Sequence, residues 1–309
     1  MYLCVSGFIK FTGNGASVKN PYVLKTMMNR IIIKTTPADL PMLRERYPFL
    51  YLEHGRLEID DSSIKWISAD SGIFRIPAAV ISTLLLGPGT SVTHEAVKIL
   101  AELNCTVCWV GEDSLRFYAV GETPTATTYN FKRQMQLACD PEKSLKIAKK
   151  MFASRFPGED ISGKNLRELM TLEGNRVQRL YCELADKYFI KWKGRSYTPG
   201  DFKLSDVTNQ LITSANAALY ALVTSVIHSL GLSPKIGFVH SGSPLPFVYD
   251  IADLYKAELV FDLAFAITGK MCGVYDRHLA ISEFRQRVID YDFMKKCPAD
   301  IIDLLGLKK

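Results

Sequence analysis

The sequence predicts an α+β fold in which a β-rich N-terminal domain is followed by a larger α-helical domain. Short runs of β-branched and aromatic residues occupy positions 47 to 120, broken by Gly, Asp and Ser. After "GETPTATT" at positions 121–128, long helical periodicities continue to the C-terminus. We therefore assign residues 33–122 to the β-rich domain and residues 129–309 to the helical domain.

The β-rich domain is expected to contain several short strands and one helix. The helix is expected near residues 93–103, where Thr93 is a suitable N-cap. The strands are expected within "FLYLEHGRLEID", "SIKWISAD", "GIFRIP", "CTVCWVG" and "LRFYAVG". Residues 1–32 precede this pattern as an N-terminal extension. We expect residues 1–26 to be disordered or foreign to the natural protein, because "FTGNGASVKNP" leads into no periodic element.

The composition is that of a globular protein with a sizeable core and reduced cysteines. Apolar residues make up 48% of the 309 positions, and the net charge of +6 permits a polyanionic partner without requiring one. Seven scattered cysteines favour reduced thiols and a cytoplasmic location. Cys105 and Cys108 form a C-x-x-C without a second pair, so we interpret them as part of a buried strand. No segment predicts a membrane span or a signal peptide.

One carboxylate interrupts the apolar face of a predicted helix over residues 165–189. Apolar residues recur there at helical spacing, and Glu173 stands where the next one is expected. A carboxylate on an inward face is costly unless it is paired or binds a metal. Gly174, which follows it, would allow something to approach the backbone closely. Glu173 is therefore either one half of a buried salt bridge, to Arg176 or Arg179, or a metal ligand.

A second group of polar residues lies in "IGFVHSGSPLPFVYDIADLYK", residues 236–256. Asp250 and Asp253 are three residues apart and share one face of a predicted helix. Acids near a helix N-terminus are common in purely structural settings, and so is a lone loop histidine such as His240. Together with Glu173, however, they make three carboxylates and one imidazole without balancing lysines. Such a donor set favours Mg²⁺ or Mn²⁺.

A divalent cation in an oxygen-rich site most often serves phosphoryl transfer. Basic side chains of the helical domain could neutralise the phosphates of a nucleic acid, although a solvated charged surface is the simpler interpretation. These residues are Lys143, Lys146, Lys149, Lys150, Arg155, Arg176, Arg179, Lys187, Lys191, Lys193 and Arg195.

Several segments resemble the CRISPR-associated spacer integrases, the Cas-one family, and within it the type I-E branch. They are "LEGNRVQRLY", "WKGRSYTPGDF", "NAALY" and "IGFVHSGSPLPFVYDIADLYK", with "FLYLEHGRLEI", "LLLGPGTSVTHEAV" and "VCWVGEDSLRFYAVG" in the β-rich domain. The resemblance covers about residues 47–270. It implies that the helical domain is catalytic and that Glu173, His240 and Asp253 bind Mg²⁺ or Mn²⁺. Asp250 would be a supporting catalytic residue.

The resemblance also implies a reaction and partners. The protein would form a homodimer and assemble with the small ferredoxin-fold CRISPR adaptation protein. It would bind double-stranded and splayed DNA, and join the 3′-hydroxyls of captured DNA to CRISPR repeat DNA by transesterification. Two other interpretations stay open. One is a stand-alone structure-selective nuclease that uses the same site on water, and the other is a non-catalytic DNA-binding scaffold whose acids form a buried polar network.

Five further positions correspond to DNA contacts of the family. Arg116 matches an arginine near the active site, Tyr197 a tyrosine that helps to read the protospacer-adjacent motif, and Tyr220 a tyrosine near the reacting strand. At two of the five, the chain departs from the family pattern. Ser243 stands where close relatives often carry lysine, and His54 where many carry a tyrosine that wedges the end of the captured duplex.

Overall fold

The structure is a computed structural model of the chain, and it describes most of both predicted domains. The expected N-terminal extension, residues 1–32, lies outside the described residues, as do Arg116 and Tyr197. The described residues are 46–60, 63–68, 72–111, 117–121, 128–196, 202, 205–271 and 273–307.

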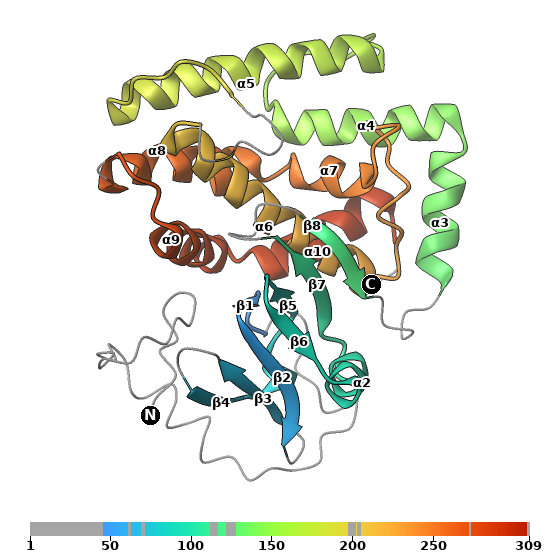
Figure 1. Cartoon of the computed structure of the whole chain (residues 1–309). Helices are drawn as coiled ribbons and strands as arrows, with labels where there is room; N and C mark the ends of the chain where they lie inside the picture. The colour runs from blue at the N-terminus through green and yellow to red at the C-terminus, as the bar shows by residue number, and fades with distance from the viewer. Residues whose placement is uncertain are drawn as a thin grey trace.

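The described N-terminal part carries two four-stranded sheets, drawn in blue and teal in Figure 1. One has the order β1-β5-β7-β8 and is parallel except for the β7–β8 pair. The other has the order β4-β3-β2-β6 and is antiparallel except for β2–β6. The strands are β1 (Leu50–Leu52), β2 (Gly55–Asp60), β3 (Ser63–Ser68), β4 (Gly72–Ile76), β5 (Thr83–Leu86), β6 (Thr90–Val92), β7 (Thr106–Val110) and β8 (Phe117–Gly121).

Cross-strand pairs explain the second sheet. Leu57 of β2 is opposite Trp66 of β3, and Trp66 is opposite Phe74 of β4. All three side chains are buried, so one face of the sheet is apolar, as strand alternation requires. Helix α2 (His94–Glu102) packs against this sheet, and the Thr93 side chain caps it by accepting the backbone N–H of Ala96. The expected helix and its N-cap are confirmed.

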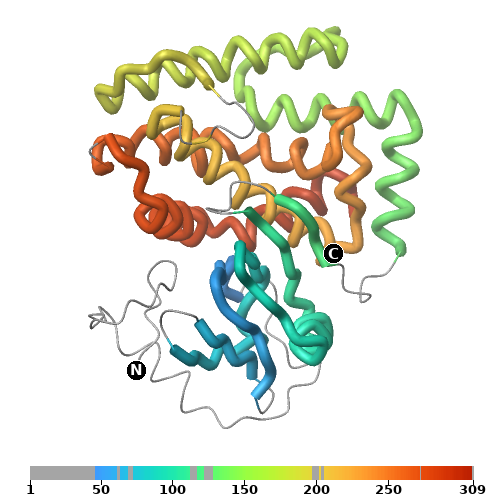
Figure 2. Tube along the Cα trace, viewed as in Figure 1, coloured from blue at the N-terminus to red at the C-terminus, as the bar shows by residue number. Residues whose placement is uncertain are grey.

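The described C-terminal part is helical and lies above the sheets in Figure 2, where the tube runs from green to red. A fold of a β-rich part followed by a helical part is therefore confirmed. The helices are α3 (Thr128–Ala138), α4 (Pro141–Arg155), α5 (Leu166–Tyr188), α6 (Val207–Ser229), α7 (Pro246–Ala252), α8 (Asp262–Thr268), α9 (Arg277–Asp290) and α10 (Phe293–Leu305). Two shorter helical segments of this part are the π-helix Ala257–Phe261 and the 3₁₀ turn Gly269–Met271. A third short segment, Ala78–Val80, lies in the β-rich part.

Helix α6 is the central element of the helical part. It has the length and apolar composition of a membrane span, but 78% of its most apolar window is buried inside the protein. It contacts helices α7, α8, α9 and α10 and also strands β5, β7 and β8. Such burial identifies α6 as the core helix around which the others pack.

The apolar core of the helical part extends into the first sheet, so the limits of separate domains stay a prediction. Phe49 just before β1, Tyr51 in β1 and Cys108 in β7 join the apolar cluster of the helical part. Cys105, just before β7, belongs to the cluster of the β-rich part instead. Burial raises the pKa of the Cys105 thiol to about 12, as expected for a packing residue. Both cysteines of the C-x-x-C are thus buried in cores.

Candidate active site

Asp250 of α7 holds together the loop that carries His240. The Asp250 carboxylate is buried and accepts the backbone N–H groups of Phe238 at 2.6 Å, Val239 at 3.1 Å and His240 at 2.9 Å. Its Oδ1 also lies 2.7 Å from Nδ1 of the His240 ring. Four hydrogen bonds compensate for the burial of this charge.

Two residues that the sequence did not single out support the same loop. A Cβ atom added to Gly237 would lie 2.9 Å from Oδ2 of Asp250, so a larger residue would displace the carboxylate. Gln134 of α3 is fully buried, and its amide donates to the carbonyls of Ser233 at 2.9 Å and Ile236 at 2.8 Å. Gln134 carried no local signal, because its partners lie about a hundred positions away. The glycine in "KIGFVH" was the visible clue.

His240 presents one free ring nitrogen toward the next acid. Because Asp250 accepts the proton of Nδ1, the lone pair of a neutral His240 ring lies on Nε2. Nε2 lies 3.8 Å from Oδ2 of Asp253, which follows the last residue of α7. The His240 side chain is 28% exposed and that of Asp253 is 10% exposed, so this edge of the site is open to a ligand.

Glu173 reaches the same place from α5. The helix begins with a capping box between Asn165 and Glu168, which sets the register that turns Glu173 inward. Its carboxylate forms an ion pair with Arg155, the last residue of α4. Nη2 of Arg155 also lies 3.8 Å from Oδ2 of Asp253. The ends of α4 and α7 and the middle of α5 thus meet at one point, on the side of the helical part away from the sheets (Figure 1).

The expected salt-bridge partners of Glu173 are wrong. Arg176 instead donates to the backbone carbonyl of Arg155 and packs its guanidinium over the Phe156 ring at 4.6 Å. Arg179 is largely exposed, with Nη2 3.9 Å from Glu159. Arg155, which the sequence placed on a basic flank, instead lies within the site with its side chain mostly buried. The partner comes from another helix because packing of α4 against α5, rather than spacing along α5, decides which cation lies nearest.

The expectation that no lysine balances the acids is also wrong. Nζ of Lys256 lies 2.6 Å from Oδ1 of Asp253, and the Lys256 side chain is only 17% exposed. Burial alone would lower the pKa of Lys256. The negative charge of Asp253, together with hydrogen bonds to Asp253 and Tyr220, raises this pKa above its ordinary value instead. Lys256 is therefore charged at neutral pH.

Aromatic residues form one wall of the site. The rings of Tyr220 and Tyr249 meet edge to face with centroids 5.0 Å apart, and Tyr249 meets the His240 ring at 5.9 Å. Lys256 lies over the Tyr220 ring at 5.0 Å. Tyr220 on α6 therefore lies beside the acids, and its assignment as a DNA contact stays a prediction. Tyr249 is a neighbour that the sequence did not single out.

Two other predicted contact positions, Ser243 and His54, lie at the surface of the described part of the chain. Ser243 is partly exposed in the loop three residues after His240. His54 is exposed in the β-rich part, in the turn between β1 and β2, with a left-handed φ of 54°. Its backbone N–H donates to the carbonyl of Pro88 at 2.9 Å. Gly174 is exposed, and a Cβ atom there would meet nothing within 4 Å, so this side of α5 is open space.

The donor set is chemically suited to a hard divalent cation, although it does not form a ready-made cage. Within the described part of the chain, no group of three or more His, Cys, Asp and Glu side chains is arranged to hold a metal ion. Glu173 and Asp253 could supply carboxylate oxygens, and His240 could supply its Nε2, because Asp250 holds the other ring nitrogen, Nδ1. Oxygen ligands with one imidazole suit Mg²⁺ or Mn²⁺. In this arrangement Arg155 and Lys256 hold the carboxylates.

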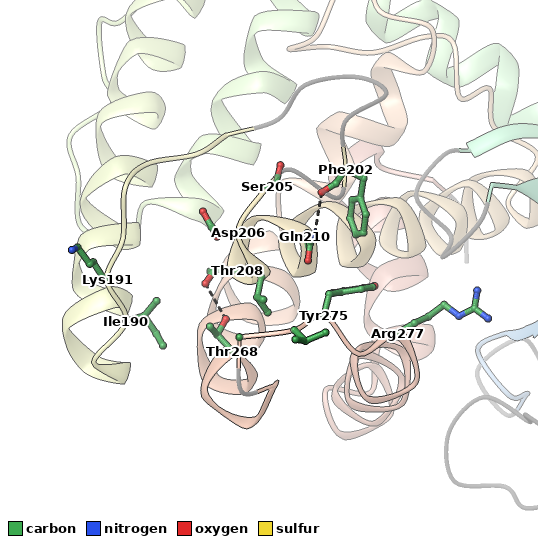
Figure 3. A pocket seen from close by; sticks show the side chains of 13 residues that line it. Ile190, Lys191, Phe202, Ser205, Asp206, Thr208, Gln210, Thr268, Tyr275 and Arg277 are labelled. Atoms are coloured by element: carbon green, nitrogen blue, oxygen red, sulfur yellow. Dashed lines mark hydrogen bonds between the residues drawn. The ribbon is translucent and has the colours of Figure 1, made fainter.

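A separate cavity of about 700 Å³ lies away from these acids, between the start of α6 and the connection from α8 to α9. Figure 3 shows two hydrogen bonds at the wall of this cavity. Gln210 donates to the carbonyl of Phe202, and the hydroxyls of Thr208 and Thr268 share the other. Tyr275 and Arg277 also line it. None of Glu173, His240, Asp250 and Asp253 lines this cavity.

The sequence matches the model of the family described as CRISPR associated protein Cas1, over residues 49–160 and 153–272. The chain belongs to the Cas1 family. Relatives of this chain carry the name CRISPR-associated endonuclease Cas1, so this is a family of nucleases.

Individual Cas1 proteins are similar to this chain over most of their length. CRISPR-associated endonuclease Cas1 2 of Chlorobaculum tepidum is 55% identical over 280 residues, which are 91% of this chain and 95% of the relative. CRISPR-associated endonuclease Cas1 of Escherichia coli is 35% identical over 246 residues, 80% of this chain and 81% of the relative. The crystal structure of a TtCas1–DNA complex superimposes with a TM-score of 0.64 at 35% identity, covering 86% of this chain and 99% of that one.

Proposed function

We propose that this Cas1 is a metal-dependent DNA integrase and endonuclease of CRISPR adaptation, which joins the 3′-hydroxyls of captured DNA to the CRISPR repeat by transesterification. The observation that carries the proposal is the contact between Asp250 and His240. It turns Nε2 of His240 toward Asp253, at the point where Arg155 links Asp253 to Glu173. A buried acid that orients an imidazole in this way is typical of a site that binds a metal.

Each residue of the site then has a distinct role. Glu173, His240 and Asp253 would hold Mg²⁺ or Mn²⁺, and Asp250 is a positioning residue that fixes the His240 tautomer. When bound, the cation would lower the pKa of the attacking hydroxyl and stabilise the charge that develops on the phosphate. Lys256, charged and mostly buried beside Asp253, supplies a fixed positive charge next to the reacting phosphate.

DNA would approach the open side of the acids. Tyr220 lies beside them and can stack on an unpaired base, and Ser243 can donate a hydrogen bond to a phosphate from the adjoining loop. His54, in its exposed turn of the β-rich part, would stack on the end of the captured duplex, where a flat imidazole replaces a phenol ring. We assign DNA contacts to Arg116 and Tyr197 on the resemblance alone. The relative named as a TtCas1–DNA complex supports DNA as the ligand.

The reaction implies an assembly. Two active sites must be set apart by the length of the captured DNA, so we propose a homodimer that acts with the small ferredoxin-fold CRISPR adaptation protein. We place the chain in the type I-E branch on its sequence motifs. We further propose a cytoplasmic location, because Cys105, Cys108, Cys139, Cys182 and Cys297 are free thiols.

One strand-transfer assay separates the proposal from its two alternatives. The protein is incubated with splayed duplex and CRISPR repeat DNA, with and without Mn²⁺ and with and without the small adaptation protein. Joining that requires metal and partner supports the integrase. Cutting without joining would favour the stand-alone nuclease, and DNA binding that is indifferent to metal would favour the scaffold.

The matched variants for this assay lie on one helix. Glu173→Gln should abolish joining, whereas Glu183→Gln, at an exposed position of α5, should leave it unchanged. Without metal, Glu173→Gln should also lower the melting temperature, because Arg155 loses its nearest anion and keeps only the longer contact to Asp253. Metal-dependent joining by Glu173→Gln at the wild-type rate would disprove the site.

A further inference from the structure

Arg155 is a cation built into the set of carboxylates that the proposed function assigns to a metal. Its side chain is 10% exposed, forms an ion pair with Glu173 and lies 3.8 Å from Asp253. Burial lowers the pKa of Arg155, and the charges of Asp253 and Asp250 oppose this effect. An arginine guanidinium stays protonated even so, and Arg155 therefore stays charged.

Two aromatic rings hold the Arg155 side chain at this place. The guanidinium carbon lies 5.3 Å from the centroid of Phe152 and 5.7 Å from that of Phe156, within the range of cation–π attraction. The two rings are themselves stacked with centroids 5.8 Å apart. Arg176 donates to the backbone carbonyl of Arg155, which satisfies an acceptor at the C-terminal end of α4. These contacts hold the positive charge of Arg155 in a fixed position beside the carboxylates.

Two of the three carboxylates of the site are matched by cations without a metal. Glu173 and Asp253 carry two negative charges, and Arg155 and Lys256 carry two positive charges beside them. The remaining acid, Asp250, is satisfied by backbone N–H groups and by His240. With the charge of Asp250 included, a divalent cation added to this arrangement would give a mostly buried site a net charge of about +1, which low-dielectric surroundings oppose.

We propose that Arg155 is an exchanging cation that occupies the carboxylates until DNA arrives. In DNA-free protein, Arg155 competes with the metal for Glu173 and Asp253 and keeps metal affinity low. A DNA phosphate adds the negative charge that the loaded site lacks, and it draws the guanidinium of Arg155 away from the carboxylates. Metal and DNA therefore bind with positive coupling, and a nuclease site is assembled mainly when its substrate is present. This inference rests on the proposed metal site and adds to it a role for a residue outside the ligand set.

The test is the affinity of DNA-free protein for Mn²⁺, measured from the electron paramagnetic resonance signal of the free ion. Arg155→Gln should bind Mn²⁺ about 5- to 150-fold more tightly than wild type, the usual range for coupling between two ligands. Arg179→Gln is the matched control, because Arg179 is an exposed arginine of α5 whose nearest acid is Glu159 at 3.9 Å, and its affinity should not change.

A second arm measures the coupling itself. A splayed duplex with 3′-deoxy ends cannot be joined, so it can be added without turnover. It should raise the Mn²⁺ affinity of wild type clearly and that of Arg155→Gln much less, because the competing cation is already gone. By reciprocity, Mn²⁺ should raise the DNA affinity of wild type by the same factor.

The outcomes separate this inference from the proposed function. Equal or weaker Mn²⁺ binding by Arg155→Gln, with binding still lost in Glu173→Gln, would overturn the exchange while leaving the metal site intact. Absence of Mn²⁺ binding in wild type and in Arg155→Gln, with and without DNA, would overturn the metal site as well. Should Arg155→Gln not fold without metal, Arg155→Met removes the same charge but keeps an apolar contact with Phe152 and Phe156. Its melting temperature must then rise with Mn²⁺ concentration more steeply than that of wild type.

Discussion

Oδ1 of Asp250 lies 2.7 Å from Nδ1 of His240 and 2.9 Å from the backbone nitrogen of the same residue. One buried carboxylate oxygen thus fixes both the main chain and the ring of His240. The second oxygen holds the two preceding residues through their N–H groups. The position of His240 therefore depends directly on Asp250 of α7.

Replacing Asp250 with asparagine should separate this positioning role from metal ligation. Asparagine keeps the size but presents an NH₂ group to at least one donor, so we expect a loss of about 3 kcal/mol in the free energy of unfolding. Urea denaturation in the presence of a chelator measures this loss without any contribution from metal. Stability equal to wild type would contradict the assignment of Asp250 as the anchor of the loop.

Gly174 tests whether DNA approaches α5. Because its Cβ would meet nothing within 4 Å, Gly174→Ala should raise the free energy of unfolding by about 0.5–1 kcal/mol through helix propensity alone. DNA binding and joining should nevertheless fall, because the new methyl group occupies space that the DNA backbone uses. Urea denaturation and DNA titration give the two quantities.

A glycine outside the helices provides the control for Gly174. Gly158 also has open space around it, but its φ of +91° disfavours any other residue, so Gly158→Ala should lower stability. A Gly174→Ala variant that is more stable and fully active would show that DNA does not come close to this side of α5.

Ser243 tests the departure from lysine in the loop after His240. Ser243→Lys places a mobile positive charge beside the reacting phosphate, and one neutralised phosphate changes the slope of log affinity against log salt by about −0.9 for duplex DNA. Titration of a labelled splayed duplex at several salt concentrations, at constant metal, measures the slope for both proteins. Parallel lines without an offset would mean that position 243 does not touch a phosphate, or that Lys256 already fills this role.

Asp262 at the start of α8 gives a pH-dependent contribution to stability. Its carboxylate accepts hydrogen bonds from Lys187 Nζ at 2.8 Å, from the Tyr188 hydroxyl at 2.8 Å and from Arg287 at 3.0 Å. Asp262 thus links α5, α8 and α9. Partial burial raises the pKa of Asp262, but these hydrogen bonds lower it more, to below its usual value. Because the folded pKa is the lower one, the contribution is present above the unfolded pKa of about 3.9 and is lost as the pH falls through the folded pKa.

The corresponding measurement compares Asp262→Asn with wild type. At pH 7 the variant should be less stable by about 1–2 kcal/mol, since the site is partly solvated. The difference should shrink as the pH falls below about 4. Asp186→Asn, at an exposed position of α5, is the control and should change little. A difference that stays constant from pH 7 to pH 3 would contradict the ionised state of Asp262.

The amino-acid sequence by itself determined the fold class and the residues that stand out in the site. Glu173 was visible because helical periodicity is local, so one polar residue on an apolar face can be recognised within a few turns. His240, Asp250 and Asp253 lie within one segment of 21 residues, and their grouping followed from proximity in the chain. The strands and the capped helix near Thr93 likewise depend on local preferences.

Tertiary structure alone decided which charges meet. Glu173 pairs with Arg155 because α4 packs against α5, and the sequence offered Arg176 and Arg179 at closer spacing. Lys256 follows Asp253 by three positions in the sequence, but only the structure shows that both side chains are mostly buried, where their ion pair is strong. Gln134 supports the His240 loop from about a hundred positions away. Electrostatic pairing depends on distance and solvent exposure in space, and neither quantity follows from the order of residues until the helices have packed.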